Sequence, residues 1–348
     1  MLRPLPDLSP EELAAWMQTK GFKEAHAPRV IRQLFETAIS ADQMPSRLGE
    51  QLTQSFSSKA AELARQQVSE DGTAKLLLRL ADGRTVESVL MPDYHPHRAA
   101  GCISSQVGCA MGCDFCATTQ TGFERNLTSG EIVEQFLHLR REARRSGRTL
   151  RTLVFMGMGE PMLNLKNVLA AVRRMADPKL GAFGWRQITI STVGIVPGME
   201  ELREADLGVH LALSLHAPDD ATRADLLPMG RRFPVQDILE AADRYQAQTG
   251  RITTIQYCLL DGVNDSLAQA RDLARLLAGR RMHVNLLRYN PTGLSLRGRT
   301  YAPSTVEHTE AFLAELRTHG AIAHLRRARG PDIDAACGQL RRRALQPA

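Results

Sequence analysis

The stretch "CISSQVGCAMGCDFC", Cys102 to Cys116, joins a short apolar run to three closely spaced cysteines in a C-x3-C-x2-C pattern. The run at 102–108 predicts a buried strand, and the glycines among the cysteines suit a loop that wraps closely around a bulky group. Structural zinc usually takes four Cys or His ligands, and no second C-x2-C pair occurs in the chain. Three thiolates fit better an iron–sulfur cube with one iron open to an outside ligand, although zinc and disulfide chemistry remain alternatives.

Downstream of this stretch, short apolar runs alternate with longer amphipathic segments. Strands are expected at 102–108, 152–159, 187–194, 209–217, 252–260 and 283–291, and helices at 129–143, 164–176, 198–205, 234–250 and 267–279. Such alternation predicts parallel βα units, and continuous apolar strands predict burial on both faces. Six units are too few for a closed eight-stranded barrel. We therefore expect an α/β fold with a partial (β/α)6 barrel, and a doubly wound sheet is the alternative.

Polar residues recur where these predicted strands end. They are Gly157, Gly159 and Glu160 after the second strand, Ser191 and Thr192 in the third, Ser214 and His216 closing the fourth, and Asn290 after the sixth. In barrel-like folds the carboxyl ends of the strands build the catalytic face. These side chains are therefore expected to meet at one face.

The chain divides into four predicted segments. Residues 1–60 read as a small helical accessory domain, in which Ser9 is the expected N-cap of a helix with Pro10 at its first position. Residues 61–100 form a linker with a β-hairpin around Asp82-Gly83. Residues 101–300 are the partial barrel. Residues 301–348 supply a last helix at 306–320, a possible strand at 321–330 and a polar tail.

Composition places the protein among ordinary globular proteins. Hydrophobic residues make up 43% of the 348 and charged residues 24%, and there is neither an apolar run of membrane length nor a basic–apolar leader. Four of the six cysteines fall within fifteen residues, which in a reducing compartment indicates metal or redox chemistry rather than a disulfide framework. We therefore expect a cytoplasmic protein.

The net charge of +6 comes with two concentrations of arginine. The first arginine group is Arg140, Arg141, Arg144, Arg145, Arg148 and Arg151; the second arginine group is Arg326, Arg327, Arg329, Arg341, Arg342 and Arg343. Each group is compatible with a solvated helix face or with phosphate contacts, and the residues alone leave both interpretations open.

Several motifs together resemble one family. The chain carries "CISSQVGCAMGCDFCATTQTGFERNLTSGEI", "GMGEPMLN", "SLHAPDD", "LLDGVND", "YNP" and "RGPDIDAACGQL". These are similar to the RlmN/Cfr branch of the radical S-adenosylmethionine (SAM) enzymes, which methylate adenine in RNA by a radical route. The resemblance extends over about residues 60–343, and the N-terminal helices also fit the accessory domain of that family.

The resemblance implies cofactors and their contacts. Cys109, Cys113 and Cys116 would hold one [4Fe-4S] cluster per chain, whose open iron binds SAM, with two SAM molecules consumed per methylation. The cofactor contacts implied are Gly159, Glu160, Ser191, Ser214, Leu215, His216 and Asn290. Without the motifs, Ser191 and Ser214 would read as polar residues at strand ends that satisfy nearby backbone groups, and His216 as a structural histidine.

The resemblance also implies three reacting residues. Cys337 matches the cysteine that is methylated first and then carries the methylene carbon to adenine, although its position alone suggests a buried small hydrophobe. Cys102 matches the second reactive cysteine, which would release the product by forming a Cys102–Cys337 disulfide. Glu87 matches a proton acceptor; an exposed hairpin glutamate is the alternative, and the segment between Glu87 and Cys102 runs two residues longer around "DYHPHR" than expected from that family. Cys258 is predicted to be a strand cysteine without chemistry.

Several functions are compatible with these features. The leading hypothesis is methylation of adenine C2 in 23S rRNA and tRNA, with an electron donor such as a flavodoxin system, a monomeric protein and no membrane partner. C8 methylation, as in the Cfr members, is the nearest alternative. A non-catalytic RNA-binding protein with a structural metal, and a radical enzyme for small molecules or peptides, are alternatives from other classes.

Overall fold

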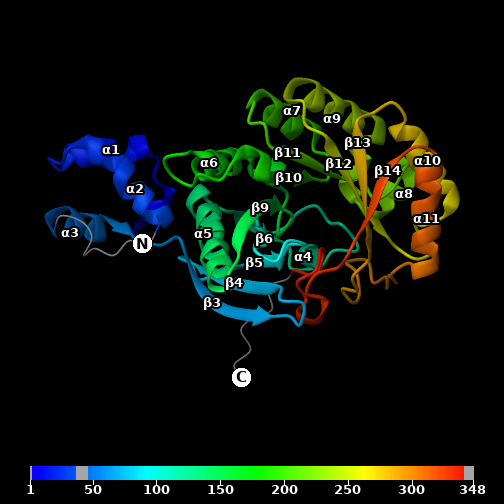
Figure 1. Cartoon of the computed structure of the whole chain (residues 1–348), viewed down its shortest axis with the longest axis horizontal. Helices are drawn as coiled ribbons and strands as arrows, with labels where there is room; N and C mark the ends of the chain where they lie inside the picture. The colour runs from blue at the N-terminus through cyan, green and yellow to red at the C-terminus, as the bar shows by residue number, and fades with distance from the viewer. Residues whose placement is uncertain (1, 37–45, 341–348) are drawn as a thin grey trace.

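A ten-stranded sheet organises the computed structural model of the chain, which describes residues 2–36 and 46–340 (Figure 1). Seven neighbouring strands are parallel: β6 (Arg98–Cys102), β9 (Thr149–Phe155), β10 (Ile188–Thr192), β11 (His210–Ser214), β12 (Thr253–Leu259), β13 (Met282–Arg288) and β14 (Ile322–Arg326). Their spatial order follows the chain order without a reversal. A doubly wound sheet reverses its strand order, so this topology is that of the partial barrel.

Three antiparallel strands extend the sheet beyond β6. They are β3 (Ala61–Val68), β4 (Ala74–Leu80) and β5 (Thr85–Pro92). The predicted hairpin forms between β4 and β5, with Gly83 at φ +83° in its turn. β3 was not predicted, because its sequence "AELARQQV" is largely polar and its side chains are mostly exposed. A strand at the edge of a sheet can be this polar because one side of it faces water.

Helices connect the parallel strands. They are α5 (Ser129–Arg145), α6 (Leu165–Ala176), α7 (Val196–Glu204), α8 (Asp220–Leu226), α9 (Val235–Thr249), α10 (Leu267–Leu277) and α11 (Val306–Thr318). α5 begins with a capping box between Thr128 and Glu131, and α10 with one between Ser266 and Gln269. Neighbouring helices pack in pairs, with α10 and α11 at one end of the molecule (Figure 1). No helix in the described part of the chain has the length and apolar character needed to cross a membrane.

The N-terminal helices lie at the opposite end of the molecule (Figure 1). They are α1 (Pro10–Thr19), α2 (Ala27–Glu36) and α3 (Ser46–Ser55), and the strand pair β1 (Arg3–Pro4) and β2 (Phe56–Ser57) closes the segment. Ser9 caps α1 as predicted, through a capping box with Glu12. The segment is anchored to the barrel, because Asp7 Oδ1 accepts a hydrogen bond from Gly130 N (2.7 Å) at the start of α5. Apolar residues at helical spacing in "APRVIRQLFETAI", residues 27–39, predict a second helix, and positions 37–39 lie outside the described residues.

The first barrel strand differs from its prediction. β6 ends at Cys102 instead of beginning there, and residues 106–108 form a separate short strand, β7 (Gln106–Gly108), which pairs with β8 (Phe123–Asn126). The apolar run at 102–108 therefore includes the end of β6 and the whole of β7, and the chain leaves the ten-stranded sheet between them. The three-cysteine loop follows β7 and ends at the short helix α4 (Ala117–Gln120).

The chain after β14 returns across the sheet. Lys75 Nζ on β4 donates to Asp334 O (3.3 Å), Ala117 N donates to Gly338 O (2.7 Å), and Thr118 Oγ1 donates to Leu340 O (2.6 Å). We call residues 327–340 the return segment. It connects the last strand to the antiparallel strands and to α4, and it brings Cys337 to the carboxyl ends of the barrel strands.

Candidate active site

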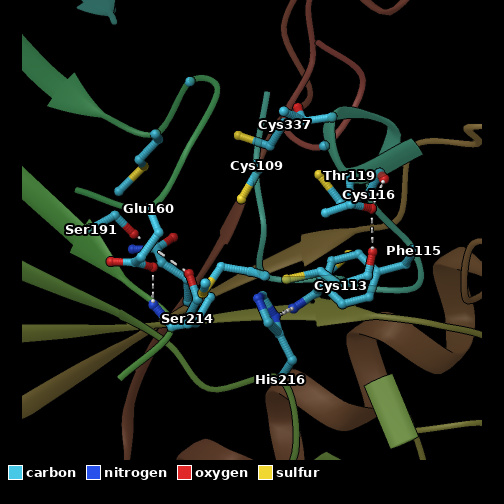
Figure 2. A pocket seen from close by; sticks show the side chains of 18 of the residues that line it. Cys109, Cys113, Phe115, Cys116, Thr119, Glu160, Ser191, Ser214, His216 and Cys337 are labelled. Carbon is cyan, nitrogen blue, oxygen red and sulfur yellow. Dashed lines mark hydrogen bonds between the residues drawn. The ribbon is translucent and has the colours of Figure 1, made fainter. Parts of the chain in front are cut away.

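A cavity lies at the carboxyl ends of the barrel strands. It encloses about 1010 Å³ of empty space, open solvent at its mouth included, which suits the size of a cofactor pocket of several hundred Å³. Twelve of the predicted residues line it: Cys109, Cys113, Cys116, Gly157, Gly159, Glu160, Ser191, Thr192, Ser214, His216, Asn290 and Cys337. We call it the cofactor cavity. Figure 2 shows Cys113 and Cys116 toward one side, Glu160, Ser191 and Ser214 toward the other, and Cys109 and Cys337 above them.

The cysteine loop is held tightly behind its three thiols. Gly108 has φ +76°, and a Cβ there would lie 1.7 Å from Gly122 O, so only glycine allows the loop to close against β8. Burial raises the pKa of Cys109 to about 12, and burial followed by the neighbouring thiols raises the pKa of Cys113 well above its usual value. Negative charge on these buried thiols would therefore need a bound cation beside it.

Glu160 stands opposite the thiols on the loop after β9. Its carboxylate accepts hydrogen bonds from Met162 N (3.1 Å) and Val193 N (2.9 Å), and burial raises its pKa to about 7. The preceding Gly159 has φ +97°, and a Cβ there would lie 2.5 Å from Gln106 Cβ. Gln106 Oε1 in turn accepts from Glu160 N (2.9 Å). The Thr192 side chain adds a hydrogen bond to the Glu160 carboxylate. A buried carboxylate held by neutral donors is suited to a ligand with an ammonium group.

The strand ends of β10 and β11 add hydroxyls and an imidazole. Ser191 Oγ and Ser214 Oγ lie 3.5 Å apart. His216 adopts φ +60°, a strained value for this residue, and its Nδ1 accepts a hydrogen bond from Cys258 N (3.0 Å). Burial, with Arg223 nearby, lowers the pKa of His216 to about 3, so the ring is neutral. Leu215 differs from the other predicted contacts, because its side chain is fully buried in the core and does not line the cavity.

A second cavity lies beside the first and holds Cys102. Cys337 and Asn290 line both cavities, whereas Cys102 lines only the second. Asn290 Nδ2 donates to Cys337 O (3.4 Å). Burial, followed by the nearby Cys337 thiol, raises the pKa of Cys102 to about 12, while Arg326 acts in the opposite direction. Both cysteines are free thiols here, so the disulfide implied by the resemblance is not formed in this structure.

Glu87 lies on β5 behind this second cavity and does not line it. Its carboxylate is buried and forms an ion pair with Lys75 (3.4 Å), so it is not the exposed hairpin glutamate of the alternative interpretation. Val89 pairs with Cys102 across β5 and β6, which places Glu87 and Cys102 on the same face of the sheet as diagonal neighbours.

The two arginine groups occupy different places. Arg326, Arg327 and Arg329 of the second group line the second cavity, and the other three members lie outside the described residues. The first group lies where α5 ends and β9 begins, at the opposite ends of the strands from the cofactor cavity. Within it, Arg141 pairs with Glu134 and Arg145 with Glu142, while Arg144 is exposed.

Some site residues were missed or underestimated from the sequence. Cys258 was assigned no chemistry, yet it lines the cofactor cavity at the end of β12. Arg223 on α8 is fully buried with Nε and Nη1 unpartnered, while its Nη2 donates to Val193 O. The convergence of parallel strand ends could have indicated Cys258. Nothing comparable indicated Arg223, because α8 was not predicted.

The comparisons with known proteins agree with this geometry. Residues 103–277 match the model of the radical SAM superfamily, so the fold and the three-cysteine cavity are those of a radical SAM enzyme. A solved radical SAM methyltransferase from Sphaerobacter thermophilus is 41% identical, with a TM-score of 0.92 over 97% of this chain and 99% of its own.

Curated relatives narrow the class. A probable dual-specificity RNA methyltransferase RlmN 1 from Opitutus terrae is 64% identical over 98% of this chain and 97% of its own. A probable RlmN from Thermus thermophilus is 42% identical over 99% and 95%. The chain therefore belongs to the RlmN family of radical SAM RNA methyltransferases.

The family implies a [4Fe-4S] cluster and SAM, and the residues present fit both. Cys109, Cys113 and Cys116 all line the cavity, and the buried Arg223 places a positive charge near Cys113. Glu160, Ser191 and Ser214 line the same cavity and offer a carboxylate and two hydroxyls, which match the amine and ribose hydroxyls of SAM.

Proposed function

We propose that the protein methylates C2 of adenine in 23S rRNA and tRNA, and that the methyl carbon passes through Cys337. The observation that supports this most is the position of Cys337, the cysteine common to the linings of the two cavities. One cavity holds the three thiols and the other holds Cys102 and the arginines. A carrier of carbon between a cofactor and an RNA base needs such a shared position.

In this scheme the sulfur of Cys337 first takes a methyl group from one SAM, which leaves as S-adenosylhomocysteine. When bound at the cluster, a second SAM supplies a 5′-deoxyadenosyl radical. Cys337 then loses one hydrogen atom from its S-methyl group, and the methylene carbon bonds to C2 of the adenine. Cys337 is exposed on the return segment, which suits a residue that must become covalently attached to RNA.

Release of the product requires a base and a second thiol. Cleavage of SAM takes one electron from the donor, and the radical adduct returns one electron to it, while Glu87 accepts the proton from C2. Cys102, as the thiolate, attacks the Cys337 sulfur; the S–S bond forms, the S–C bond breaks, and the carbon takes a proton to become the methyl group. A dithiol reductant then restores both cysteines, which places the reaction in the reducing cytoplasm. A flavodoxin-type donor and a monomeric protein complete the proposal.

The deciding experiment is anaerobic turnover with labelled SAM on a 23S rRNA fragment and on tRNA, followed by nucleoside mass spectrometry. We expect 2-methyladenosine in both RNAs. Formation of 8-methyladenosine would instead support the C8 alternative, which uses the same cysteines. A colourless protein with bound zinc and no methylated product would overturn the radical mechanism.

The role proposed for Cys102 predicts a specific defect. Cys102→Ala should stall with RNA attached through Cys337, because the displacing thiol is missing, and a slowly migrating RNA–protein species should appear in denaturing gels. Cys258→Ala is the matched control, since it removes another cavity cysteine and should accumulate no such species. Absence of the adduct from the Cys102 variant would contradict the role given to Cys102.

A further inference from the structure

The turn between β5 and β6 presents an aromatic side chain to solvent. Tyr94 is 81% exposed, the highest value among the large hydrophobic side chains in the described residues. Its turn is nevertheless ordered by backbone hydrogen bonds, from Asp93 N to Arg98 O (3.1 Å) and from Arg98 N to His95 O (2.9 Å). A large aromatic ring held in water by a rigid turn gains little from folding, so it is a candidate contact for another molecule.

The ring is supported from one side by a single guanidinium group. Arg329 Cζ lies 5.9 Å from the centroid of the Tyr94 ring. A cation over one face restricts the orientation of the ring and leaves the opposite face open. Arg329 also lines the second cavity together with Cys102 and Cys337, so the exposed ring is connected to the reacting cysteines through one side chain.

This turn also contacts residues at or next to both arginine groups. Thr149 N, next to Arg148 of the first group, donates to His97 O (2.9 Å), while Arg329 belongs to the second group. Among the residues that the structure describes, no carboxylate oxygen comes within 4.0 Å of the guanidinium nitrogens of Arg98, Arg144 or Arg327, and all three side chains are exposed. Of these three, Arg98 closes the turn that carries Tyr94, so a cation without a described ion pair lies close to the ring along the chain.

Three acidic groups near this turn keep their negative charge but are held by hydrogen bonds from neutral groups of the protein. Asp93 accepts from Tyr94 N (2.6 Å), Asp71 from Thr73 N (2.8 Å), and Asp332 from Ser69 Oγ (2.5 Å). Arginines beside a flat, open aromatic face match single-stranded RNA, whose phosphates are anionic and whose unpaired bases stack on aromatic rings.

We propose that Tyr94, supported by Arg329, is a stacking platform for an unpaired base of the substrate RNA, with Arg98 and the exposed arginines of both groups contacting its phosphates. The inference rests on RNA being the substrate, as in the proposed function. β6 runs from Arg98 to Cys102, about 13 Å at 3.3 Å per residue, so the base on Tyr94 neighbours the target and is not itself the target. An adenine that leaves its own stack exposes such neighbours.

The test measures RNA affinity by fluorescence anisotropy, without SAM, using a labelled 23S rRNA stem-loop and a tRNA that the wild type methylates. Stacking of one base is worth about 1–3 kcal/mol, so Tyr94→Ala should weaken binding at least about fivefold. Tyr94→Phe keeps the ring and should bind within about twofold of the wild type. Val306→Ala, which removes an exposed apolar side chain at the start of α11, is the control and should not change affinity.

Salt dependence separates stacking from phosphate contacts. Tyr94→Ala should leave the slope of log K against log salt concentration unchanged, whereas Arg98→Gln should reduce it by about 1. Photocrosslinking of RNA that contains 4-thiouridine should label the peptide with Tyr94. If Tyr94→Ala binds RNA with wild-type affinity and the Tyr94 peptide is not labelled, the stacking platform is overturned, while methylation of RNA by the wild type still supports the proposed function. If the wild type does not methylate RNA, the proposed function itself is overturned.

Discussion

The two cavities on either side of Cys337 differ in the charge of their walls. The cofactor cavity is lined by five cysteines, one carboxylate, a neutral imidazole and Arg288, whereas the second cavity adds Arg326, Arg327 and Arg329 to Arg288 around Cys102. Donor atoms suited to iron and to an amine lie on one side, and cations suited to phosphate lie on the other. In the proposed function, cofactor and RNA are therefore recognised at separate walls, and Cys337 serves both.

The largest expected effects come from replacing Cys113 and Cys337, which should change different measured properties. Cys113→Ala should lose iron and the cleavage of SAM, because two thiolates hold the cluster poorly. Cys337→Ala should retain iron and visible absorbance but transfer no labelled methyl group to RNA. Iron and sulfide analysis of both purified variants, with methyl counting on RNA, checks the pair. Loss of iron from the Cys337 variant would show that the two cavities are not independent.

The next effect concerns the two reacting thiols. Cys102 is buried with its pKa raised to about 12, whereas Cys337 is exposed, so iodoacetamide at pH 8 should modify Cys337 at least about 100-fold faster. The thiolate fraction of Cys102 increases about tenfold per pH unit below its pKa, so its slow rate should rise with pH through pH 11. Peptide mass spectrometry of the anaerobic holoenzyme measures both rates. Equal rates at pH 8 would contradict the burial of Cys102.

A smaller effect is expected from Glu160 on the cofactor side. Glu160→Gln keeps the shape and one acceptor oxygen but removes the charge that a bound ammonium would meet. A hydrogen bond to a charged group is worth about 1.5–3 kcal/mol, so SAM binding should weaken about 10- to 100-fold. Equilibrium dialysis with labelled SAM measures this, and RNA affinity serves as the internal control because it should not change.

The smallest effect is expected from the arginines that line the second cavity. Arg326→Gln and Arg327→Gln should each weaken RNA binding by a few fold and reduce the salt slope by about 1, with SAM binding unchanged. Anisotropy titrations at several salt concentrations measure the slope. A change in SAM affinity instead would indicate that these arginines belong functionally to the cofactor cavity.

The sequence predicted most reliably what depends on local pattern. The parallel strands from β9 to β13, the capped helix α1 and the turn at Asp82-Gly83 follow from periodicity, capping and turn chemistry, and they formed as expected. The cysteine motif and the strand-end residues located the cofactor cavity, because parallel strands direct their carboxyl ends to one edge.

What the sequence missed depends on contacts between distant segments. β3 is polar because it lies at an edge, and α8 is too short to show a periodicity. The burial of Glu87 depends on Lys75 across the hairpin, which the turn register could have revealed. The unpartnered nitrogens of Arg223 could not be inferred, because they depend on how α8 packs behind the cysteine loop.

The return segment also sets an order of events during synthesis. Residues 327–340 leave the ribosome more than 200 residues after the three-cysteine loop, and domains fold as the chain emerges from its N-terminal end. Until the hydrogen bonds from Ala117 N to Gly338 O and from Thr118 Oγ1 to Leu340 O form, the end of the three-cysteine loop lacks its contacts with the return segment. A nascent chain thus has its three-cysteine loop long before Cys337, and under the proposed function an unfinished chain has no means of attaching itself to RNA.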